Sequence, residues 1–417
     1  MWYRLKSVGV SGISIQFSID RLIRILIVTA VLALLAGYAI LSFPGRKDTL
    51  DFSQFYAAGQ MVRQGLGHSL YDLNTQLQFQ SRLARVHTFY SHPPFEAIVF
   101  VPFTFTSYRT AYGLWTLLGL GLLIVSAWLI DCSAHVSATI SQYLRFPADL
   151  GLVMVLFATF SPVTTCLLIG QDSLLLLLVF SLVYVLLRRD HEFSAGCVLA
   201  CGLFKFQFAL PFALVLLFRG RWRALKGFSL VGALLFILSL AISGMGALSA
   251  YPRLLFQEKI FQVLGDLAYV PNIRGLLGLI SGNRTSSGHL ILIAICSLLV
   301  LWMAARNWRQ EQLPLSFSGA LLAALLASYH LYAYDLSLLL LPIALLLTEV
   351  RTVAPSRFYR HYALLFFSCV VLLFIPPLHL WLIVHRLYVL MAIPIAGLFA
   401  TSIQLSRIKD KPSLSAP

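Results

Sequence analysis

The sequence carries little charge. Only 16 of its 417 residues are Asp or Glu, and charged residues of both signs make up 11% of the chain, about half the usual share in soluble proteins. Hydrophobic residues make up 59%. A soluble globule cannot bury that much apolar surface, and a disordered chain does not contain it. At ~20 residues per span, it is enough for ~12 membrane helices. The composition therefore predicts an all-α polytopic membrane protein.

The motifs of soluble enzymes and of metal centres are missing as well. The six cysteines form no Cys-x-x-Cys pair, and most lie inside apolar runs, so we interpret them as helix-packing residues. No P-loop, dinucleotide-binding glycine pattern, His-Glu-x-x-His or Gly-x-Ser-x-Gly motif occurs. The sequence thus predicts no cofactor. It also gives no reason to expect a metal, although a divalent cation stays open.

Basic residues exceed acidic ones by 15, but they gather in short clusters between apolar runs. This is typical of membrane orientation signals rather than of a nucleic-acid-binding surface. The two long loops, 44–92 and 245–288, carry nine Lys and Arg, whereas six shorter segments (1–21, 188–192, 219–226, 306–314, 349–361 and 405–417) carry 17. The positive-inside rule then predicts a multi-pass protein of the inner (plasma) membrane, with both long loops outside and both termini cytoplasmic.

Thirteen apolar segments are candidates for the membrane spans. They cover residues 22–43, 93–107, 109–130, 148–166, 173–187, 194–206, 207–218, 227–244, 289–305, 315–329, 335–348, 362–376 and 381–404. Two cytoplasmic termini require an even number of crossings, so one segment does not cross. We expect this to be 93–107, which is short and contains Pro102; the stretch around Gly170 and Gln171 is the alternative re-entrant element.

Basic residues flank 194–218 on both sides, so this stretch must cross twice, with its turn near Lys205. The whole prediction is about 12 transmembrane helices plus re-entrant or juxtamembrane helices. They form a single domain over 1–410, followed by a loose tail at 411–417.

The outer loop 44–92 is the richest in candidate chemistry. Phe52, Phe55 and Tyr56 recur at helical spacing, which predicts an amphipathic helix along the membrane surface. Asp51 stands at its start. Asp51 is either a plain helix cap or a carboxylate fixed at the membrane–water boundary for chemistry.

Other ionisable residues lie within or beside apolar runs, where they are costly and usually functional. Lys205 either snorkels to the interface or faces an anion. Asp172 either caps the next helix or acts within the membrane. His330 and Asp335 flank a group of tyrosines, and an interfacial aromatic belt would explain only the tyrosines. Arg274, in the second outer loop, is a further cation of the kind that a lipid phosphate would need.

These residues, in this order, resemble glycosyltransferase family 87 of the GT-C superfamily, whose best-known members are polyprenol-phosphate-mannose-dependent mannosyltransferases. The resemblance covers about residues 40–380. Its motifs run from Asp51 to Gly59, Gly67 to Asp72, Tyr90 to Pro94, Ile169 to Gln171 and Arg219 to Ala224, then from Asn272 to Leu276, and include Lys205, His330 and Asp335. The family often has Gln-Ser where this chain has Ile273-Arg274, and proline where it has Phe206. The identity of the substrate therefore does not carry over.

The resemblance implies a GT-C fold and an integral-membrane glycosyltransferase. A sugar, with mannose the first choice among hexoses, would pass from a polyprenyl-phosphate-linked donor to an acceptor hydroxyl on a lipid or glycan. Transfer would occur on the outer face with inversion. Asp51 would be the base, and Lys205, His330 and Arg274 would bind the donor phosphate. Supporting or substrate-binding residues would be Tyr56, Tyr71, His92, Gln171, Asn272 and Asp335.

Two other functions stay open from the residues alone. A transporter or lipid flippase needs charged groups in the middle of helices and usually an internal repeat. A polysaccharide polymerase or ligase that uses an undecaprenyl-diphosphate donor usually has a large outer loop late in the chain. Here the polar residues gather in outer loops and at helix ends, and the first outer loop is the rich one. We expect Asp51, Lys205, Asn272 and His330 to line one outward-facing cleft.

Overall fold

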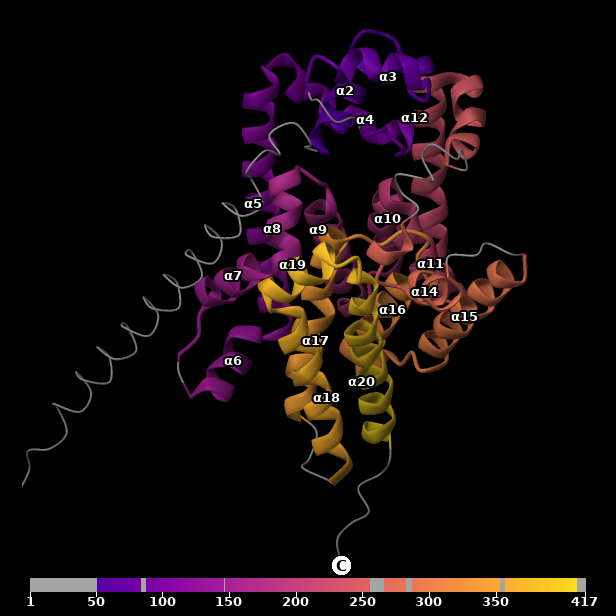
Figure 1. Cartoon of the computed structure of the whole chain (residues 1–417). Coiled ribbons are helices and arrows are strands. Elements are labelled where there is room, and N and C mark those ends of the chain that lie inside the picture. The colour runs from indigo at the N-terminus through magenta and orange to yellow at the C-terminus, as the bar shows by residue number, and fades with distance from the viewer. Residues whose placement is uncertain are drawn as a thin grey trace, which may run out of the picture.

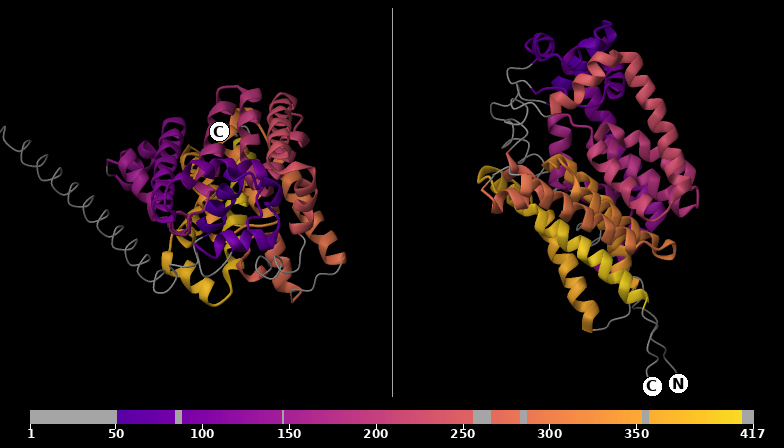
Figure 2. Two further views of the ribbon diagram at one scale, coloured as in Figure 1. Left: turned by 90° about the horizontal axis from the view of Figure 1, so that it is seen from above. Right: turned by 90° about the vertical axis from the view of Figure 1, so that its right-hand side faces the viewer.

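The computed structural model describes residues 51–83, 88–145, 147–255, 266–282, 287–352 and 357–410. Throughout these ranges the regular elements are helices, with no strand. Figures 1 and 2 show a layer of short helices, which we call the outer cap, at one end of a bundle of longer helices. The expected first span at 22–43 and the tail at 411–417 lie outside the described residues.

The outer cap is built from α2 (Phe52–Arg63), α3 (Leu73–Gln80) and α4 (Pro94–Phe100), which continues into the 3₁₀ helix η2 (Val101–Phe105). The apolar face of α2 is buried in the cap itself. The ring of Phe55 stacks on that of Phe100 at 4.6 Å between centroids, and Phe52 is fully buried. The predicted amphipathic helix exists, but it packs against protein and not along a membrane surface. Segment 93–107, predicted not to cross, lies in this cap.

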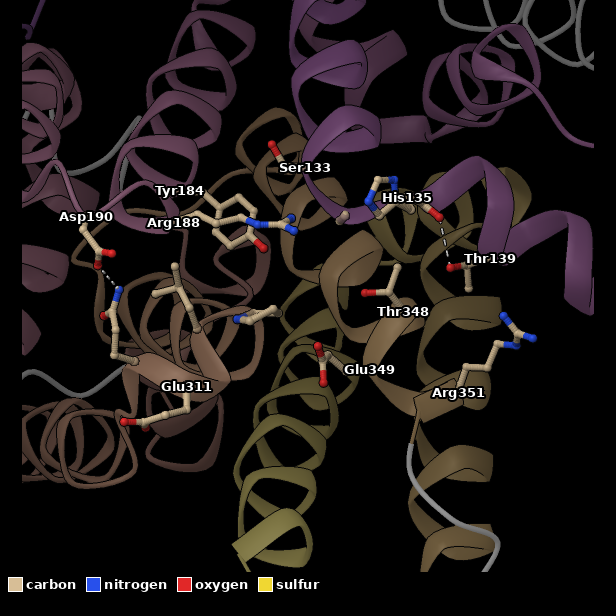
Figure 3. A pocket seen from close by; sticks show the side chains of 14 residues that line it. Ser133, His135, Thr139, Tyr184, Arg188, Asp190, Glu311, Thr348, Glu349 and Arg351 are labelled. Atoms are coloured by element: carbon tan, nitrogen blue, oxygen red, sulfur yellow. Dashed lines mark hydrogen bonds between the residues drawn. The ribbon is translucent and has the colours of Figure 1, made fainter.

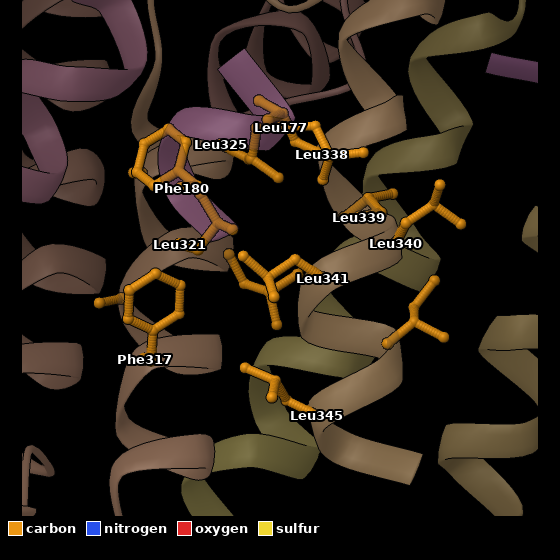
Figure 4. Packing of buried hydrophobic residues seen from close by; sticks show 14 of the residues in the cluster. Leu177, Phe180, Phe317, Leu321, Leu325, Leu338, Leu339, Leu340, Leu341 and Leu345 are labelled. Carbon is orange, nitrogen blue, oxygen red and sulfur yellow. The ribbon is translucent and has the colours of Figure 1, made fainter. Parts of the chain in front are cut away.

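The bundle contains the remaining helices, long and short. They are α5 (Tyr108–Ala134), α6 (Val136–Leu144), α7 (Leu150–Thr159), α8 (Ser161–Ile169), α9 (Ser173–Arg188), α10 (Glu192–Cys201), α11 (Phe206–Phe218), α12 (Trp222–Leu255), α14 (Ile273–Ile280), α15 (Ser287–Arg306), α16 (Leu313–Ala327), α17 (Leu340–Thr352), α18 (Arg357–Leu373), α19 (Pro376–Val384) and α20 (Ala392–Asp410). Leucine and phenylalanine from α9, α16 and α17 fill the centre (Figure 4). Leu177, Phe180 and Leu321 there are fully buried, as expected for helices that pack inside a membrane bundle.

Within the described residues, six helical stretches are long and apolar enough to cross a membrane, or eight if each of two bent pairs is one span. The predicted span 148–166 is such a pair: α7 and α8 meet at 70°, next to Pro162 in the first turn of α8. The predicted span 381–404 is not continuous, because α19 ends at Val384 and α20 begins at Ala392. Pro162 marks the first of these breaks, and Arg386, with a left-handed φ of 56°, lies in the second. Neither break is visible in the apolar pattern of the sequence, because a continuous apolar run does not show where a helix ends.

The chain turns back near Lys205, as predicted; that the two limbs cross the membrane separately stays a prediction, because Glu192–Phe218 counts as one of the six candidate spans. The 3₁₀ turn η3 (Gly202–Lys205) joins α10 to α11, and Arg221 Nη1 donates to Glu192 Oε1 at 2.6 Å. Glu192 begins α10 and Arg221 follows α11, so the two limbs start and finish at the same end of the bundle. Lys205 is thereby placed at the other end, beneath the outer cap.

Segments predicted to be cytoplasmic meet at the end of the bundle away from the cap. Arg221 also donates to Gln310 Oε1 at 2.9 Å, and Lys409 pairs with Glu349. A cavity of about 550 Å³ lies at this end. Figure 3 shows the side chains that line it, among them the charged Arg188, Glu349 and Arg351. The basic loops therefore share one end, as the positive-inside rule requires; that this end is cytoplasmic stays a prediction.

The second outer loop is only partly a loop. α12 continues past its break at Gly244, where φ is 71°, to Leu255. Tyr251 there stacks on Tyr71 at 4.9 Å and donates its hydroxyl to the Ser91 carbonyl at 3.1 Å. The first part of the predicted loop 245–288 therefore belongs to the outer cap and buttresses it.

Glycine sets the contact between α10 and α12. A Cβ atom on Gly196 would lie 1.7 Å from the carbonyl oxygen of Ala224, so the backbones must separate if any side chain is added. We expect Gly196→Ala to lower the free energy of unfolding by about 1–3 kcal/mol, as overpacking does. Gly113→Ala is the matched control, because nothing lies within 4 Å of its Cβ position. Unfolding midpoints in detergent measure both, and equal midpoints for the two variants would contradict this packing.

Candidate active site

A cavity of about 300 Å³ lies between the outer cap and the bundle. The cap contributes Asp51, Gln54 and residues 88–92, and the bundle contributes residues around 171, 204–207 and 330–335. Six of the ten candidate site residues line it, drawn from distant parts of the chain: Asp51, His92, Gln171, Lys205, His330 and Asp335. Arg274, Asn272, Tyr56 and Tyr71 are not among the lining residues.

Asp51 precedes α2, yet its side chain makes no capping hydrogen bond. Its Oδ2 instead accepts a hydrogen bond from Gln171 Nε2 at 2.7 Å, across the cavity from the end of α8. Gly170, with φ 73°, makes the turn that aims Gln171 at Asp51. The cap interpretation of Asp51 is therefore wrong. Burial raises the pKa of Asp51 above its ordinary value, against the opposing effects of Gln171 and Lys205, so its carboxylate is a better proton acceptor than an exposed one.

Lys205 lies at the cavity wall and is 2% exposed. Its Nζ is 2.7 Å from Asp172 Oδ1 and 2.6 Å from Asp335 Oδ1, and it donates to Ser173 Oγ at 2.7 Å. An ammonium has three N–H groups, and these three contacts use all of them. Lys205 thus joins the start of α9 to the segment before α17. It lines the cavity as expected, but its hydrogen bonds go to protein groups.

Asp172, next to Gln171, is a buried carboxylate to which the sequence gave no firm role. Its side chain does not cap α9, so that alternative is wrong. It shares Lys205 with Asp335, whose Oδ2 also accepts the backbone N–H of Tyr332 at 3.1 Å. The signal in the sequence was a carboxylate between two apolar runs, which is rare unless it is paired.

His330 lines the cavity between two tyrosines. Its ring is stacked on that of Tyr332 at 5.9 Å and meets that of Tyr329 edge-on at 4.4 Å. Burial lowers the pKa of His330 to about 3, and the nearby Arg274 charge adds to this effect. The imidazole is therefore neutral near pH 7, so it offers a hydrogen bond and not a positive charge.

Arg274 and Asn272 hold the segment that carries His330. Arg274 Nη1 donates to the Tyr329 carbonyl at 3.0 Å, and its guanidinium lies 4.0 Å from the centre of that ring. Asn272 caps α14 through Gly275 N and donates Nδ2 to the Ser328 carbonyl at 2.6 Å. Asn272, which we expected to line the cleft, is not among the lining residues of the cavity. The expectation that Arg274 binds the donor phosphate stays a prediction.

Tyr56 and Tyr71 also stand outside the cavity. The Tyr56 hydroxyl donates to the Thr106 carbonyl at 2.7 Å, which ties α2 to the end of η2. The Tyr71 hydroxyl donates to the His92 carbonyl at 2.8 Å. Both tyrosines therefore hold the outer cap together, and Tyr71 fixes the backbone of a residue that does line the cavity.

His92 faces two carboxylates. Its Nδ1 lies 2.7 Å from Glu96 Oε2 and 3.8 Å from Asp172 Oδ2. Glu96 is 2% exposed, and neither of its oxygens makes a hydrogen bond within the described part of the chain. Sequence reasoning assigned Glu96 no role, because its position in the first turn of α4 is where a helix favours an acidic residue anyway.

Taken together, the fold and the cavity define an all-helical, polytopic membrane protein with a carboxylate-rich chamber under its outer cap. The model of glycosyltransferase family 87 matches residues 90–342, well over half of the chain, and the chain belongs to this family. It is accordingly a membrane glycosyltransferase. The matched span includes Lys205, His330 and Asp335 but begins after Asp51. A comparison with curated proteins finds no match, and neither does one with solved structures.

Proposed function

We propose that this glycosyltransferase moves a sugar from a polyprenyl-phosphate-linked donor to an acceptor hydroxyl on a lipid or glycan, at the outer face of the plasma membrane and with inversion. A hexose, mannose first, is the proposed sugar. The observation that carries the proposal is the position of Asp51. Its carboxylate lines a buried cavity with Lys205 and His330, and it is held there by a side chain from another helix.

In the proposed reaction Asp51 accepts the proton of the acceptor hydroxyl while the hydroxyl oxygen attacks the anomeric carbon. The bond from that carbon to the phosphate oxygen breaks, and its electron pair leaves with the polyprenyl phosphate. Attack from the face opposite the leaving group inverts the anomeric centre. A neutral His330 donates a hydrogen bond to the leaving phosphate, where negative charge develops. Arg274 and Asn272 hold His330 in place.

The chamber suits this substrate class. Its volume of about 300 Å³ is at the lower end for ligand pockets, which favours a single sugar over an oligosaccharide. Aromatic rings of Phe89, Phe206 and Tyr334 form part of its wall and offer flat apolar surfaces to the sugar and its lipid carrier. The rest of the wall carries carboxylate and amide side chains. These groups form hydrogen bonds with the hydroxyls of a sugar.

A transporter or flippase has less support. Its substrate would need a route between the two ends of the bundle, and the chamber under the cap shares no lining residue with the cavity at the other end. A diphosphate-linked donor remains a competitor within the transferase class, and the choice of donor separates it from the proposal.

The test is a donor panel offered to membranes that contain the full chain. We expect sugar transfer from a polyprenyl-phosphate hexose, and transfer at least about tenfold slower from the polyprenyl-diphosphate and nucleotide forms of the same sugar, because neither places a lone phosphate beside His330. Membranes with His330→Ala are the control, and they should lose transfer. Equal or faster transfer from the diphosphate donor would reassign the enzyme to the polymerase or ligase class.

A further inference from the structure

Three potential ligand groups converge behind the wall of the chamber. His92 Nδ1, a Glu96 carboxylate oxygen and an Asp172 carboxylate oxygen all lie within 4.8 Å of one another. They come from the loop before α4, from α4 itself and from the start of α9, so the outer cap and the bundle both contribute. Their separations of 2.7 and 3.8 Å from the imidazole nitrogen are spacings that one ion with bonds of about 2.0–2.2 Å can bridge.

Glu96 supplies the second, independent observation. It is a carboxylate at 2% exposure, and among the described residues no donor reaches its oxygens with hydrogen-bond geometry. Its nearest polar neighbours are His92 and Asp172, the other two members of the group. Its 2.7 Å approach to His92 Nδ1 lacks hydrogen-bond geometry. A buried carboxylate without a partner costs several kcal/mol unless a charge compensates it. The Lys205 ammonium contacts Asp172, Asp335 and Ser173, so it acts on Glu96 only from a distance.

The charges of the group point the same way. Asp172 gives Oδ1 to Lys205 and turns Oδ2 toward His92. With Asp335, three buried carboxylates lie around one ammonium, that of Lys205. When all three are ionised, one divalent cation balances the two negative charges that Lys205 leaves.

We propose that His92, Glu96 and Asp172 bind a divalent transition-metal ion of the Mn²⁺ or Zn²⁺ type. One imidazole with two carboxylates favours such ions over Mg²⁺ and Ca²⁺, which prefer oxygen ligands alone. The binding geometry does not depend on the proposed reaction. If that reaction is correct, the ion adds positive charge beside a chamber that Asp51 and Asp335 make acidic, and this favours a phosphate there. The sequence gave no reason to expect a metal, because His92 and Glu96 alone are only a pair and Asp172 lies far from them in the chain.

The test is a direct binding titration. The full-length protein, purified in detergent and stripped with EDTA, is titrated with Mn²⁺, and free Mn²⁺ is followed by its electron paramagnetic resonance signal. We expect saturation at one ion per chain. Glu96→Gln keeps the shape of the side chain but removes its charge, and it should weaken binding by on the order of tenfold or more. Zn²⁺ should displace Mn²⁺, and Mg²⁺ at the same concentration should not.

Glu192→Gln is the matched control, because Glu192 lies at the opposite end of the bundle and pairs with Arg221; its Mn²⁺ affinity should equal that of the parent. Thermal unfolding with and without Mn²⁺ provides a second readout that needs no sugar donor. The ion should raise the midpoint of the parent and leave that of Glu96→Gln unchanged. Equal Mn²⁺ affinity in the parent and Glu96→Gln, or no saturable binding in the parent, overturns the proposal. So does an infrared band of a protonated carboxyl that persists in excess Mn²⁺ and vanishes in Glu96→Gln, because Glu96 would then share a proton with Asp172.

Discussion

Asp51→Asn should reduce the rate of sugar transfer by on the order of 10²-fold or more, the usual cost of losing a positioned base. The amide still offers an oxygen to Gln171, which donates to Asp51 at 2.7 Å, so the geometry of the chamber is kept while the basicity is lost. Transfer is measured with saturating donor in membranes, and the amount of folded protein is checked by its unfolding midpoint, which should hardly change.

Asp72→Asn is the matched control for this substitution. Asp72 is a true cap of α3, since its side chain accepts the N–H of Thr75, and Asn caps helices about as well as Asp. It should therefore leave transfer unchanged. If Asp51→Asn keeps near-normal turnover while Asp335→Asn is inactive, the base has been assigned to the wrong carboxylate. The family could still be correct, because its match begins after Asp51.

The pH profile gives a second view of the same residue. A base works when deprotonated, so the transfer rate should be lost as the pH falls through the pKa of Asp51. Burial raises that pKa above 3.8, and the acid limb should lie correspondingly higher than for an exposed Asp. His330, with its pKa lowered to about 3, should add no limb near neutral pH.

Composition and charge distribution predicted the class of protein and the sorting of loops to two ends, because membrane insertion depends on apolar length and basic flanks. The same rules located the turn at Lys205, since the basic residues on both sides allow no other path. They missed the breaks at Pro162 and Arg386, because an apolar run does not reveal where a helix bends inside protein. The count of 12 spans accordingly stays a prediction.

At the site, the sequence pointed to charged residues inside apolar runs, because such residues cost free energy unless they are paired. It did not point to charged residues in positions where they are common, such as the first turn of a helix. Lys205 stood out because an ammonium in an apolar run needs a partner. Its partners could be named only from the fold, which brings Asp172 and Asp335 together from positions far apart in the chain. Arg274 was a candidate because of its charge. Its guanidinium lies over the ring of Tyr329 and donates a hydrogen bond to the carbonyl of the same residue. A lone side chain's role depends on neighbours that one sequence does not reveal.

Lys205→Met should lower the free energy of unfolding by about 3–5 kcal/mol, the cost of breaking a buried ion pair by removing one partner. Both Asp172 and Asp335 would keep buried negative charge without the ammonium that lies 2.7 and 2.6 Å from them. The measurement is the unfolding midpoint of the purified chain in detergent. Lys226→Met, at an exposed lysine, should change it little.

The double variant Lys205→Met with Asp335→Asn separates charge balance from a direct role at the donor. The amide introduced by Asp335→Asn would leave only Asp172 uncompensated. Its single oxygen would still accept the N–H of Tyr332, which now bonds to Oδ2 of Asp335. Its NH₂ group would face the Ser173 hydroxyl, which now donates to Oδ1 and can also accept. Part of the lost stability should therefore return, although sugar transfer should not. If Lys205→Met is instead as stable as Lys226→Met and loses only donor binding, then Lys205 faces the donor phosphate, as the sequence first suggested. The ion pairs with Asp172 and Asp335 would then form only in the absence of donor.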